Sequence, residues 1–600
     1  MTSAHERLLR PAALAGFLAV AGLAGCKRAG HANGEISRNW LPPQQEQTLG
    51  VPAAEIQAAI QTRLGGPPPA PVTADQWKHV NKLYATFNHS LLWLDDKGVH
   101  QPRVSALLTA LAGADSDALK LDAYPLTELS QALVAVDNKH ATAQELADAD
   151  VLLSAAYTAY GETMLTGQIA PSSANQSWHI NPLEEHVDSA LALTLREDDF
   201  AAGLVRMRPQ DPGYDSLRTK FAAFRELAAH GGWEPVPAGR TLKRGDSDSP
   251  ARIEALRARL RVEGYLADSS AGSAPSPTPT SADTAPPRKP SSSAGHAART
   301  GPGIYDSELA AAVSEFQRRH SIDVTGALDK ATVDALNVPA SYRLAEIAAN
   351  LERYRWMPRS LGTRYVVVNV PEFRLDAYDS GQKQLEMKVI VGQEYEDKAT
   401  PVFSDSMEFV IFRPYWNITP DIAAKEIFPK VAADPGYLDA NDMEEYSDHG
   451  RRAVRQRPGP KNALGFVKFI FPNDYNIYFH DTPNHELFKK DVRAFSHGCI
   501  RLEKPAELAE WVLGWPLDKV QAAMQGSDNH QVNLPKKLPV YITYFTTYVK
   551  GGQLNFGNDL YDRDSKLVTL LESEGLSSPA TVEAQAKLRA LAKADHSADG

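Results

Sequence analysis

Apolar residues follow two different spacings along this chain. Between residues 75 and 235 they recur every three or four positions, as in 104–111 and 149–157, with Pro and Gly between such stretches. This spacing is typical of amphipathic helices. From residue 362 to 550 they are mostly β-branched or aromatic and form short runs separated by Pro, Gly and polar turns, as strands do. The pattern predicts a helical domain over 75–235 and a mainly β domain over 362–550.

The predicted β domain has an internal organisation of its own. A more helical and charged stretch, residues 421–457, interrupts the strands, and we expect it to be an insertion that caps the sheet. Pro505–Leu513 has the apolar spacing of a helix. The expected strands are residues 365–370, 373–378, 385–391, 407–412, 466–471 and 477–480.

Residues 236–338 predict a small helical unit with a long interruption. Helical spacing is present at 253–265 and again after residue 305, whereas residues 269–302 contain mainly Ala, Ser, Pro, Thr and Gly. Such a composition cannot bury a core, so we expect a disordered loop. Because loop closure costs only about 0.6 kcal/mol per doubling of length, the loop need not destroy the domain. Residues 339–361 predict a connecting helix that is stopped by Pro358.

The two ends of the chain predict export and little packed structure. Arg7 and Arg10 precede an apolar run that is too short to span a bilayer, which is typical of a targeting segment over residues 1–26. Residues 27–74 are polar and contain Pro-Pro pairs, so we expect a flexible tether. For residues 551–600 we expect a C-terminal segment and tail.

Composition narrows the class of protein. Six hundred residues, 43% of them hydrophobic and 23% charged, describe a folded protein of several domains. The 63 basic and 74 acidic residues give a formal net charge of −11, so nucleic acid is not expected as a partner. The two cysteines cannot make a disulfide framework, and each needs its own explanation.

Cys26 is explained by the residues before it. Leu23-Ala-Gly-Cys26 resembles the lipobox of bacterial lipoproteins, in which the cysteine is lipidated and becomes the first residue of the mature chain. This resemblance implies a periplasmic, lipid-anchored protein, and Lys27 in place of Asp favours the outer membrane. A plain secretory signal is the alternative, and it also implies export. If Cys26 is lipidated, Cys499 is the only thiol. An unpaired thiol is usually a liability in an oxidising compartment, so its presence suggests that the protein uses it.

Cys499 lies in Ser496-His-Gly-Cys-Ile-Arg501, just before the predicted helix. A thiol attacks as its thiolate and needs a base or a cation nearby. His480, at the end of a predicted strand, and His497, on the same face as Cys499 if that segment is extended, are the candidate bases. Gly498 permits a strained turn whose backbone N–H groups can face developing negative charge. The segment therefore predicts nucleophilic catalysis by Cys499.

Two other kinds of cysteine site fit the sequence less well. Zinc could use His480, His485, His497 and Cys499, but the exported chain has no second thiolate and no His-Glu-x-x-His. A papain-like hydrolase would need Cys-Gly-x-Cys, which the sequence lacks. We expect no metal and no cofactor.

Two blocks around the cysteine resemble the L,D-transpeptidase catalytic domain. They are His480-Asp-Thr-Pro-Asn-His485 and Ser496-His-Gly-Cys-Ile-Arg501. Further blocks are similar to the large, multidomain branch of this family: residues 415–420, 427–430, 434–437, 457–465 and 559–564.

Residues 236–338 are similar to the three-helix peptidoglycan-binding domain. The similarity is clearest at Ala312-Val313, Phe316-Gln317, Gly326 and Thr332. Together the resemblances imply a multidomain α+β protein. They imply a helical scaffold domain, a small three-helix peptidoglycan-binding domain and a mainly β L,D-transpeptidase catalytic domain with a helical capping insertion.

The resemblance implies acyl transfer between peptidoglycan stem peptides, in cell-wall biogenesis and the maintenance of cell shape. The Cys499 thiolate would attack the carbonyl of the third residue of a tetrapeptide stem, release the terminal D-alanine and hold the stem as a thioester. The amine of a third residue on a neighbouring stem would then form a 3→3 cross-link.

The resemblance also implies roles for residues of the site. His480 would be the general base, oriented by the backbone carbonyl of Asp481. The backbone N–H groups of Gly498 and Cys499 would form the oxyanion hole, and His497 would have a supporting role. The residues expected at the substrate are Arg501, which would hold a stem carboxylate or brace the loop, and Tyr478, Trp416, Asn417 and Asn484, which would line the donor groove or pack.

Two alternatives stay open. The same acyl-enzyme could transfer the stem to water or to a lysine of an envelope protein, as a carboxypeptidase, a cross-link hydrolase or a protein-attaching enzyme. A non-enzymatic wall-binding lipoprotein is the other, although an intact His480, Gly498, Cys499 and Arg501 argues against it. The expected partners are peptidoglycan stem peptides, the membrane through the lipid anchor, carbapenem-type inhibitors and other cell-wall synthases.

Overall fold

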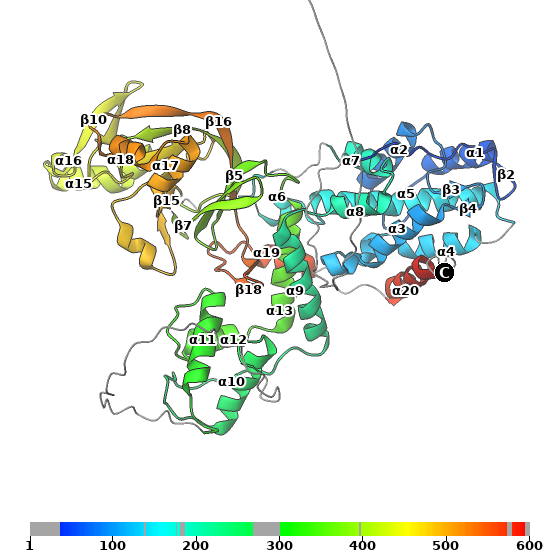
Figure 1. Ribbon diagram of the computed structural model, residues 1–600, viewed down its shortest axis with the longest axis horizontal. Coiled ribbons are helices and arrows are strands. Elements are labelled where there is room, and N and C mark those ends of the chain that lie inside the picture. Colours follow the sequence, from blue (N-terminus) through cyan, green and yellow to red (C-terminus); the bar gives the residue numbers. More distant parts are fainter. Residues whose placement is uncertain are drawn as a thin grey trace, which may run out of the picture.

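The computed structural model describes residues 36–136, 140–175, 177–180, 186–267, 301–394, 398–572 and 579–594. The expected signal segment, Cys26 and residues 269–300 of the expected loop lie outside these residues. Figure 1 shows a helical domain, a three-helix domain and a β domain around two long helices, α9 (Pro212–Ala229) and α13 (Ala340–Arg355). This is the multidomain α+β architecture that the sequence predicted.

The helical domain is built around α5 (Ala143–Thr166), most of whose residues are buried. The buried Asp150 carboxylate accepts hydrogen bonds from the Tyr84 hydroxyl at 2.6 Å and the Trp93 N–H at 2.8 Å. These bonds fix α2 (Ala74–Thr86) and the segment after it on α5. Further helices of the domain are α3 (Gln101–Ala112), α4 (Leu126–Val136), α7 (Val187–Leu195) and α8 (Phe200–Met207). The short helix α6 (Pro171–Ala174) follows α5, and its buried Ala174 lies in the core of the β domain.

Part of the expected tether is folded. Helix α1 (Ala53–Leu64) packs on α5, and its Ile56, Ile60 and Leu64, spaced four residues apart, lie in the core of the helical domain. The expectation of a flexible tether over 27–74 is therefore wrong for this helix. The proline pairs that suggested a tether flank an apolar helix face three turns long.

The C-terminal segment returns to the helical domain. Helix α20 (Pro579–Ala594) packs against α3 and α4, with Ala584 and Leu588 in the domain core (Figure 1). The Gln585 amide donates to the backbone carbonyl of Ala112 at 2.8 Å. These residues are not a tail, because the helix buries its small apolar face against a distant part of the sequence.

Helices α10 (Pro250–Val262), α11 (Ser307–Arg319) and α12 (Lys330–Leu336) form the three-helix domain. The buried Gln317 amide donates to Thr332 Oγ1 at 2.8 Å, and its oxygen accepts from the Gly326 N–H at 2.8 Å. The positions that carried the resemblance thus join the turn before α12 to α11.

The β domain is one sheet closed on itself. Its strand order is β14-β7-β15-β13-β12-β8-β16-β5-β6, and β6 pairs again with β7. Alternate side chains such as Val366, Val368 and Phe412 are fully buried in its interior. The strands are β5 (Arg364–Asn369), β6 (Arg374–Asp379), β7 (Gln382–Gly392), β8 (Phe403–Phe412), β12 (Val467–Ile470), β13 (Phe479–His480), β14 (Ala494–Ser496), β15 (Ile500–Leu502) and β16 (His530–Thr543).

The longest strand, β16, was not among the strands that the sequence pattern predicted, and neither were the three-residue strands β14 and β15. Strand β16 pairs with both β8 and β5, and its register with β8 shifts between Asn533 and Leu538. Pro535 and the lysine pair after it lie at this irregularity and hide the alternation of the strand. The helix expected at Pro505–Leu513 is present as α17 and is followed by α18 (Leu517–Gln525).

The insertion expected over 421–457 is helical only in its first half. The second half is a hairpin held by cross-strand ion pairs such as Glu445–Arg452. Charged pairs stand where alternating apolar residues would have indicated a strand, so the pattern did not predict one. The elements are α14 (Pro420–Ile422), the π-helix η4 (Ala423–Ile427), α15 (Phe428–Ala433), α16 (Tyr437–Ala440), β10 (Met443–Asp448) and β11 (Arg451–Gln456), which pairs with β9 (Trp416–Asn417).

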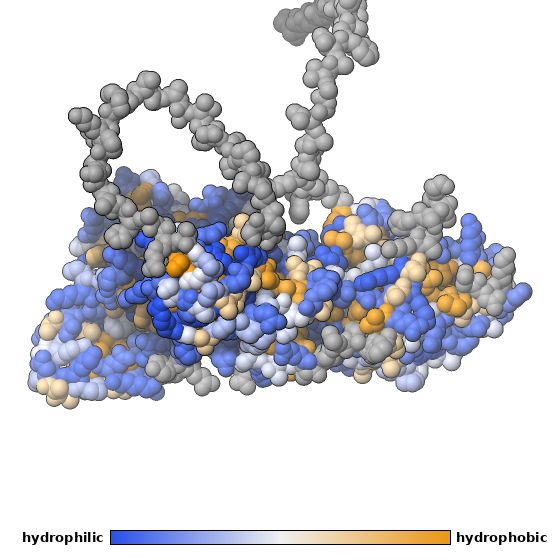
Figure 2. All heavy atoms as spheres, turned by 90° about the horizontal axis from the view of Figure 1, so that it is seen from below, coloured by the Kyte–Doolittle hydropathy of each residue, from blue (hydrophilic) through white to orange (hydrophobic). Residues whose placement is uncertain are grey.

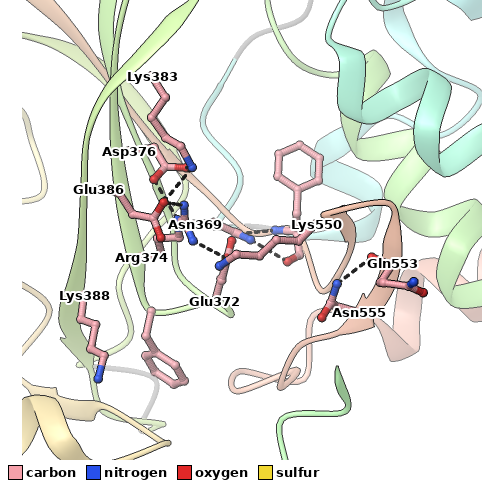
Figure 3. Close-up of polar contacts among 12 residues, drawn as sticks. Asn369, Glu372, Arg374, Asp376, Lys383, Glu386, Lys388, Lys550, Gln553 and Asn555 are labelled. Atoms are coloured by element: carbon pink, nitrogen blue, oxygen red, sulfur yellow. Dashed lines mark hydrogen bonds and ion pairs between the residues drawn. The ribbon is translucent and has the colours of Figure 1, made fainter. Parts of the chain in front are cut away.

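Ion pairs cover the outer side of β6 and β7, as Figure 3 shows. We call this set the outer charge network: the cations Arg374, Lys383 and Lys550 and the carboxylates Glu372, Asp376 and Glu386. Arg374 pairs with Asp376 at 2.8 Å, Lys383 with Glu386 at 2.8 Å and Lys550 with Glu372 at 3.1 Å. The Lys550 pair ties the hairpin of β17 (Thr547–Lys550) and β18 (Gln553–Phe556) to the sheet.

The face shown in Figure 2 is mostly hydrophilic, with apolar residues in small patches. Within the described part of the chain, no helix combines the length and the apolar character that a membrane span requires.

Candidate active site

Cys499 lies in the tight loop between β14 and β15. Gly498, just before it, has φ of 113°, a region that favours glycine. Ser496 Oγ accepts a hydrogen bond from the Gly498 N–H at 3.1 Å and donates one to the Cys499 carbonyl at 2.5 Å. Glycine and serine together fix the path of the backbone around the thiol.

The serine changes the expected oxyanion hole. The Gly498 N–H is already bonded to Ser496 Oγ. Among the described residues, the Cys499 N–H has no hydrogen-bond acceptor. Of the two expected donors, one is therefore occupied in this structure, because a hydroxyl two residues earlier reaches it.

Hydrogen bonds from segments distant in sequence also hold the loop in place. Thr400 Oγ1 donates to the Gly498 carbonyl at 2.8 Å. The Tyr561 hydroxyl donates to the Gly392 carbonyl at 2.8 Å, and Arg563 donates to the Thr400 carbonyl at 3.1 Å. Sequence reasoning did not name these residues as part of the site. Tyr561 and Arg563 lie in one of the blocks that carried the resemblance, which was the available signal.

Three adjacent strands place titratable side chains in a row beside the thiol. In the strand register, Lys468 of β12 pairs with His480 of β13, and His480 pairs with Arg501 of β15. Tyr478 and Cys499 lie two residues before His480 and Arg501, just outside β13 and β15, and the Ile500 N–H donates to the Tyr478 carbonyl at 3.1 Å. The structure thus brings the predicted Cys499, His480, Tyr478 and Arg501 together and adds Lys468.

His480 is buried, with 5% of its surface exposed. Its Nδ1 lies 2.6 Å from the Asp481 carbonyl oxygen, the contact that the family resemblance implied. Burial first, and then the charges of Arg501 and Lys468, lower the pKa of His480 to about 3, against the hydrogen bond to Asp481. The imidazole is therefore neutral, with Nδ1 as donor and Nε2 as a free acceptor.

The Cys499 thiol is partly exposed and protonated. Burial raises the pKa of Cys499 to about 11, while hydrogen bonds from Tyr478 and the charges of Lys468 and Arg501 act in the opposite direction. Its Sγ lies 3.5 Å from the Asn476 carbonyl oxygen, the acceptor for the S–H. Within the described part of the chain, no hydrogen bond joins this thiol to His480, and such contacts often form only once substrate is bound.

Two cations flank His480 without a counter-ion. Among the described residues, no carboxylate lies within ion-pair distance of Lys468 or Arg501, and Arg501 Nε is buried without a hydrogen-bond partner. The Lys468 ammonium lies 5.4 Å from the centre of the Tyr478 ring. Sequence reasoning missed Lys468, although a single charged residue in the apolar run Phe466–Phe471 was a usable signal.

His497 turns toward the insertion. Its Nε2 lies 2.7 Å from Glu426 Oε1 on η4, and Lys398 Nζ lies 3.7 Å from the same oxygen. The hydrogen bond from His497, followed by the charges around it, lowers the pKa of Glu426 against the effect of burial. The insertion is therefore linked to the nucleophile loop one residue from Gly498.

Three predicted groove residues are not joined to this row. Trp416 and Asn417 lie on β9, paired with Gln456 and Arg455 of the insertion. Asn484 donates its backbone N–H to Thr482 at 3.2 Å in the loop after β13. Among the described residues, none of the three has a hydrogen bond or ion pair to Cys499, so their place in a groove stays a prediction.

Metal ligands are not grouped in the residues that the structure describes. No set of three or more His, Cys, Asp or Glu side chains there is arranged to hold an ion. The chemistry available to the site is that of a thiol, a neutral imidazole, a phenol and two cations.

Three segments of the chain match known domain families. Residues 363–542 match the L,D-transpeptidase catalytic domain, residues 78–221 the Scaffold domain and residues 292–336 the "Putative peptidoglycan binding domain".

One curated relative, from Haemophilus influenzae, is named "Putative L,D-transpeptidase". It is 30% identical over 242 residues, which are 37% of this chain and 48% of that protein. The match thus spans about half the length of the relative.

Two solved structures are similar at low identity. An L,D-transpeptidase from Xylanimonas cellulosilytica (residues 123–326) is 16% identical and covers 52% of this chain and all of that chain, with a TM-score of 0.17. The "Ldtfm-avibactam carbamoyl enzyme" is 12% identical and covers 31% of this chain and 51% of that chain, with a TM-score of 0.14. Similarity at these TM-scores says nothing further about this chain.

Proposed function

We propose that this chain, which matches an L,D-transpeptidase catalytic domain, a Scaffold domain and a peptidoglycan-binding domain, forms 3→3 cross-links between peptidoglycan stem peptides. One observation carries the proposal. The only described cysteine lies on a glycine-kinked loop of the matched catalytic domain, in a cluster with a neutral, carbonyl-oriented histidine.

The first half-reaction makes a thioester. His480 Nε2 takes the proton from Cys499, and the sulfur attacks the carbonyl carbon of the third residue of a tetrapeptide stem. The carbon–sulfur bond forms and the peptide bond to the terminal D-alanine breaks, with the proton passing from His480 to the departing amine. The Cys499 N–H stabilises the oxyanion, and the Gly498 N–H joins it if Ser496 releases it.

The second half-reaction makes the cross-link. The amine of the third residue of a neighbouring stem loses a proton to His480 and attacks the thioester, and the sulfur leaves as thiolate. One peptide bond is exchanged for another, so no nucleotide is consumed. Arg501 would hold a stem carboxylate, and Tyr478 lies beside the attacking sulfur.

The insertion limits access of water to the thioester. The Glu426–His497 contact holds it against the nucleophile loop, and exclusion of water favours an amine acceptor over hydrolysis. Deletion of residues 421–457 should raise hydrolysis relative to cross-linking, and an unchanged product ratio would refute this role.

The proposed location, the periplasm with a lipid anchor, rests on sequence motifs alone. Residues 1–26 support export, and Cys26 supports a lipid anchor, with Lys27 favouring the outer membrane. Residues 236–338 would hold the wall near the active site. Other cell-wall synthases are proposed partners, because they would supply the stem-bearing strands that this reaction joins.

The testing experiment is mass spectrometry of muropeptides after incubation of tetrapeptide-stem disaccharides with the protein or with Cys499→Ala. Cysteine-dependent 3→3 dimers would establish the proposal. Loss of D-alanine without dimers would assign water or a protein lysine as acceptor, and no reaction would favour the wall-binding alternative. A carbapenem should leave a stable adduct on Cys499, visible as a gain in intact mass.

A further inference from the structure

Lys468 is a largely buried lysine on an otherwise apolar strand, which is an unusual position for a charged side chain. Its neighbours on β12 are apolar and fully buried, Val467 and Phe469, and its register pairs it with His480 on the reactive face. Two strands away, Arg501 flanks the same histidine. A partly buried cation is costly unless a negative charge is near it.

The side chains that act on Cys499 and His480 are two cations, Lys468 on β12 and Arg501 on β15, and the neutral phenol of Tyr478, just before β13. Among the described residues, no carboxylate pairs with either cation. The acidic side chain nearest in sequence, Asp481, instead accepts the Phe466 and Thr482 N–H groups. The negative charge that acts on both Lys468 and Arg501 is the thiolate of Cys499, when it forms.

We propose that Lys468 is a positioning residue of this site, whose ammonium stabilises the Cys499 thiolate across the Tyr478 ring while Arg501 acts from the opposite side. Burial lowers the pKa of Lys468, and a negative charge on Cys499 raises it again. The same two cations disfavour a proton on His480, so the pair keeps the imidazole neutral and lowers the free energy of the thiolate that forms when Cys499 gives up its proton. The inference rests on the proposed function only in taking Cys499 as the nucleophile.

The test measures the rate of alkylation of Cys499 by iodoacetamide against pH. The full-length protein carries Cys26→Ser, so that Cys499 is the only thiol. Lys468→Met and Lys468→Gln should move the midpoint of the profile upward by about one pH unit and lower the rate at pH 7 about tenfold. Lys468→Arg should restore the parent profile, and the exposed Lys536→Gln, a matched loss of one charge, should leave it unchanged.

Thermal unfolding separates this role from a structural one. Because no carboxylate in the described part of the chain pairs with Lys468, Lys468→Met should unfold at the parent temperature or above it. An unchanged midpoint in Lys468→Met and Lys468→Gln would overturn the proposal, and so would a midpoint that moves as far in Lys468→Arg. Alkylation needs no peptidoglycan, so a protein that behaves as expected here but makes no dimers would refute the transpeptidation and leave the role of Lys468 intact.

Discussion

Two groups of charged side chains lie on strands of the same closed sheet, and only one of them is neutralised. In the outer charge network, every cation has a carboxylate at 2.8 to 3.1 Å (Figure 3). Around His480, Lys468 and Arg501 have none among the described residues. The two groups share a scaffold and residue types, so the difference lies in what the strands place opposite each cation.

The comparison separates stabilising charge from functional charge. Paired ions at a surface contribute little each, about 0.2 to 1 kcal/mol, but they hold a hairpin and a sheet in register. Unpaired cations beside a thiol cost stability and lower the energy of any anion that forms there. The site is therefore expected to trade stability for reactivity, whereas the outer charge network is not.

The largest effect should come from removing the nucleophilic sulfur that the two unpaired cations face. Cys499→Ala should abolish release of D-alanine, dimer formation and the carbapenem adduct, because no thioester can form without the sulfur. Intact-mass and muropeptide spectrometry would detect any residual product. An adduct on the Ala variant would show that another residue is the nucleophile.

Removal of the histidine should have the next largest effect. His480→Gln should lower the rate of acylation about 10²- to 10⁴-fold, because the variant loses the base and keeps the two cations. Stopped-flow acylation by a carbapenem measures it. His485→Gln, a nearby exposed histidine, is the control, and an equal loss in both variants would contradict the assignment.

Acid should lower the free energy of unfolding of the protein through its buried histidine, His480. The folded pKa of His480 is about 3 and its unfolded pKa about 6.5, so between these values the unfolded chain binds the extra proton. Stability is present above pH 6.5 and is lost as the pH falls. The loss from this group should reach about 2 kcal/mol between pH 6.5 and 4.5. Denaturant unfolding of the parent and of His480→Gln checks it, since the variant should lose less.

A smaller effect is expected where the insertion meets the loop. Glu426→Gln keeps the shape of the side chain and weakens its contact with His497, so the ratio of hydrolysis to cross-linking should rise about two- to fivefold. Quantified muropeptides give the ratio. Glu444→Gln, on the far hairpin of the insertion, should leave it at the parent value.

The smallest effect should come from the outer charge network. Lys383→Gln removes one paired and half-exposed cation and should lower the free energy of unfolding by about 0.5 kcal/mol. The pH profile of Cys499 alkylation should not move. A shifted profile would mean that charge far from the thiol controls it and would weaken the comparison.

Much of the site could be predicted because its chemistry is local in sequence. Gly498, Cys499 and Arg501 lie within one short motif, and the base ends a strand nineteen residues earlier. Lys468 and Thr400 lie outside these motifs, and strand pairing and loop contacts bring them to the thiol; the lone charge of Lys468 in an apolar run marked it as unusual but did not show that it lies near Cys499. The occupied Gly498 N–H depends on the rotamer of Ser496, which no sequence pattern specifies.

The elements of the fold also fall into those that local sequence predicts and those that depend on distant contacts. The helical spacing, the apolar strands and the helix after the cysteine were readable because each repeats a period that local structure imposes. Helices α1 and α20 and strand β16 were not, because their short or interrupted apolar faces gain stability only against partners far away in the chain. The sequence alone determined the nucleophile, its loop and the division into helical and β parts, whereas the tertiary structure decided which charges meet at the thiol, since register across three strands is a long-range property.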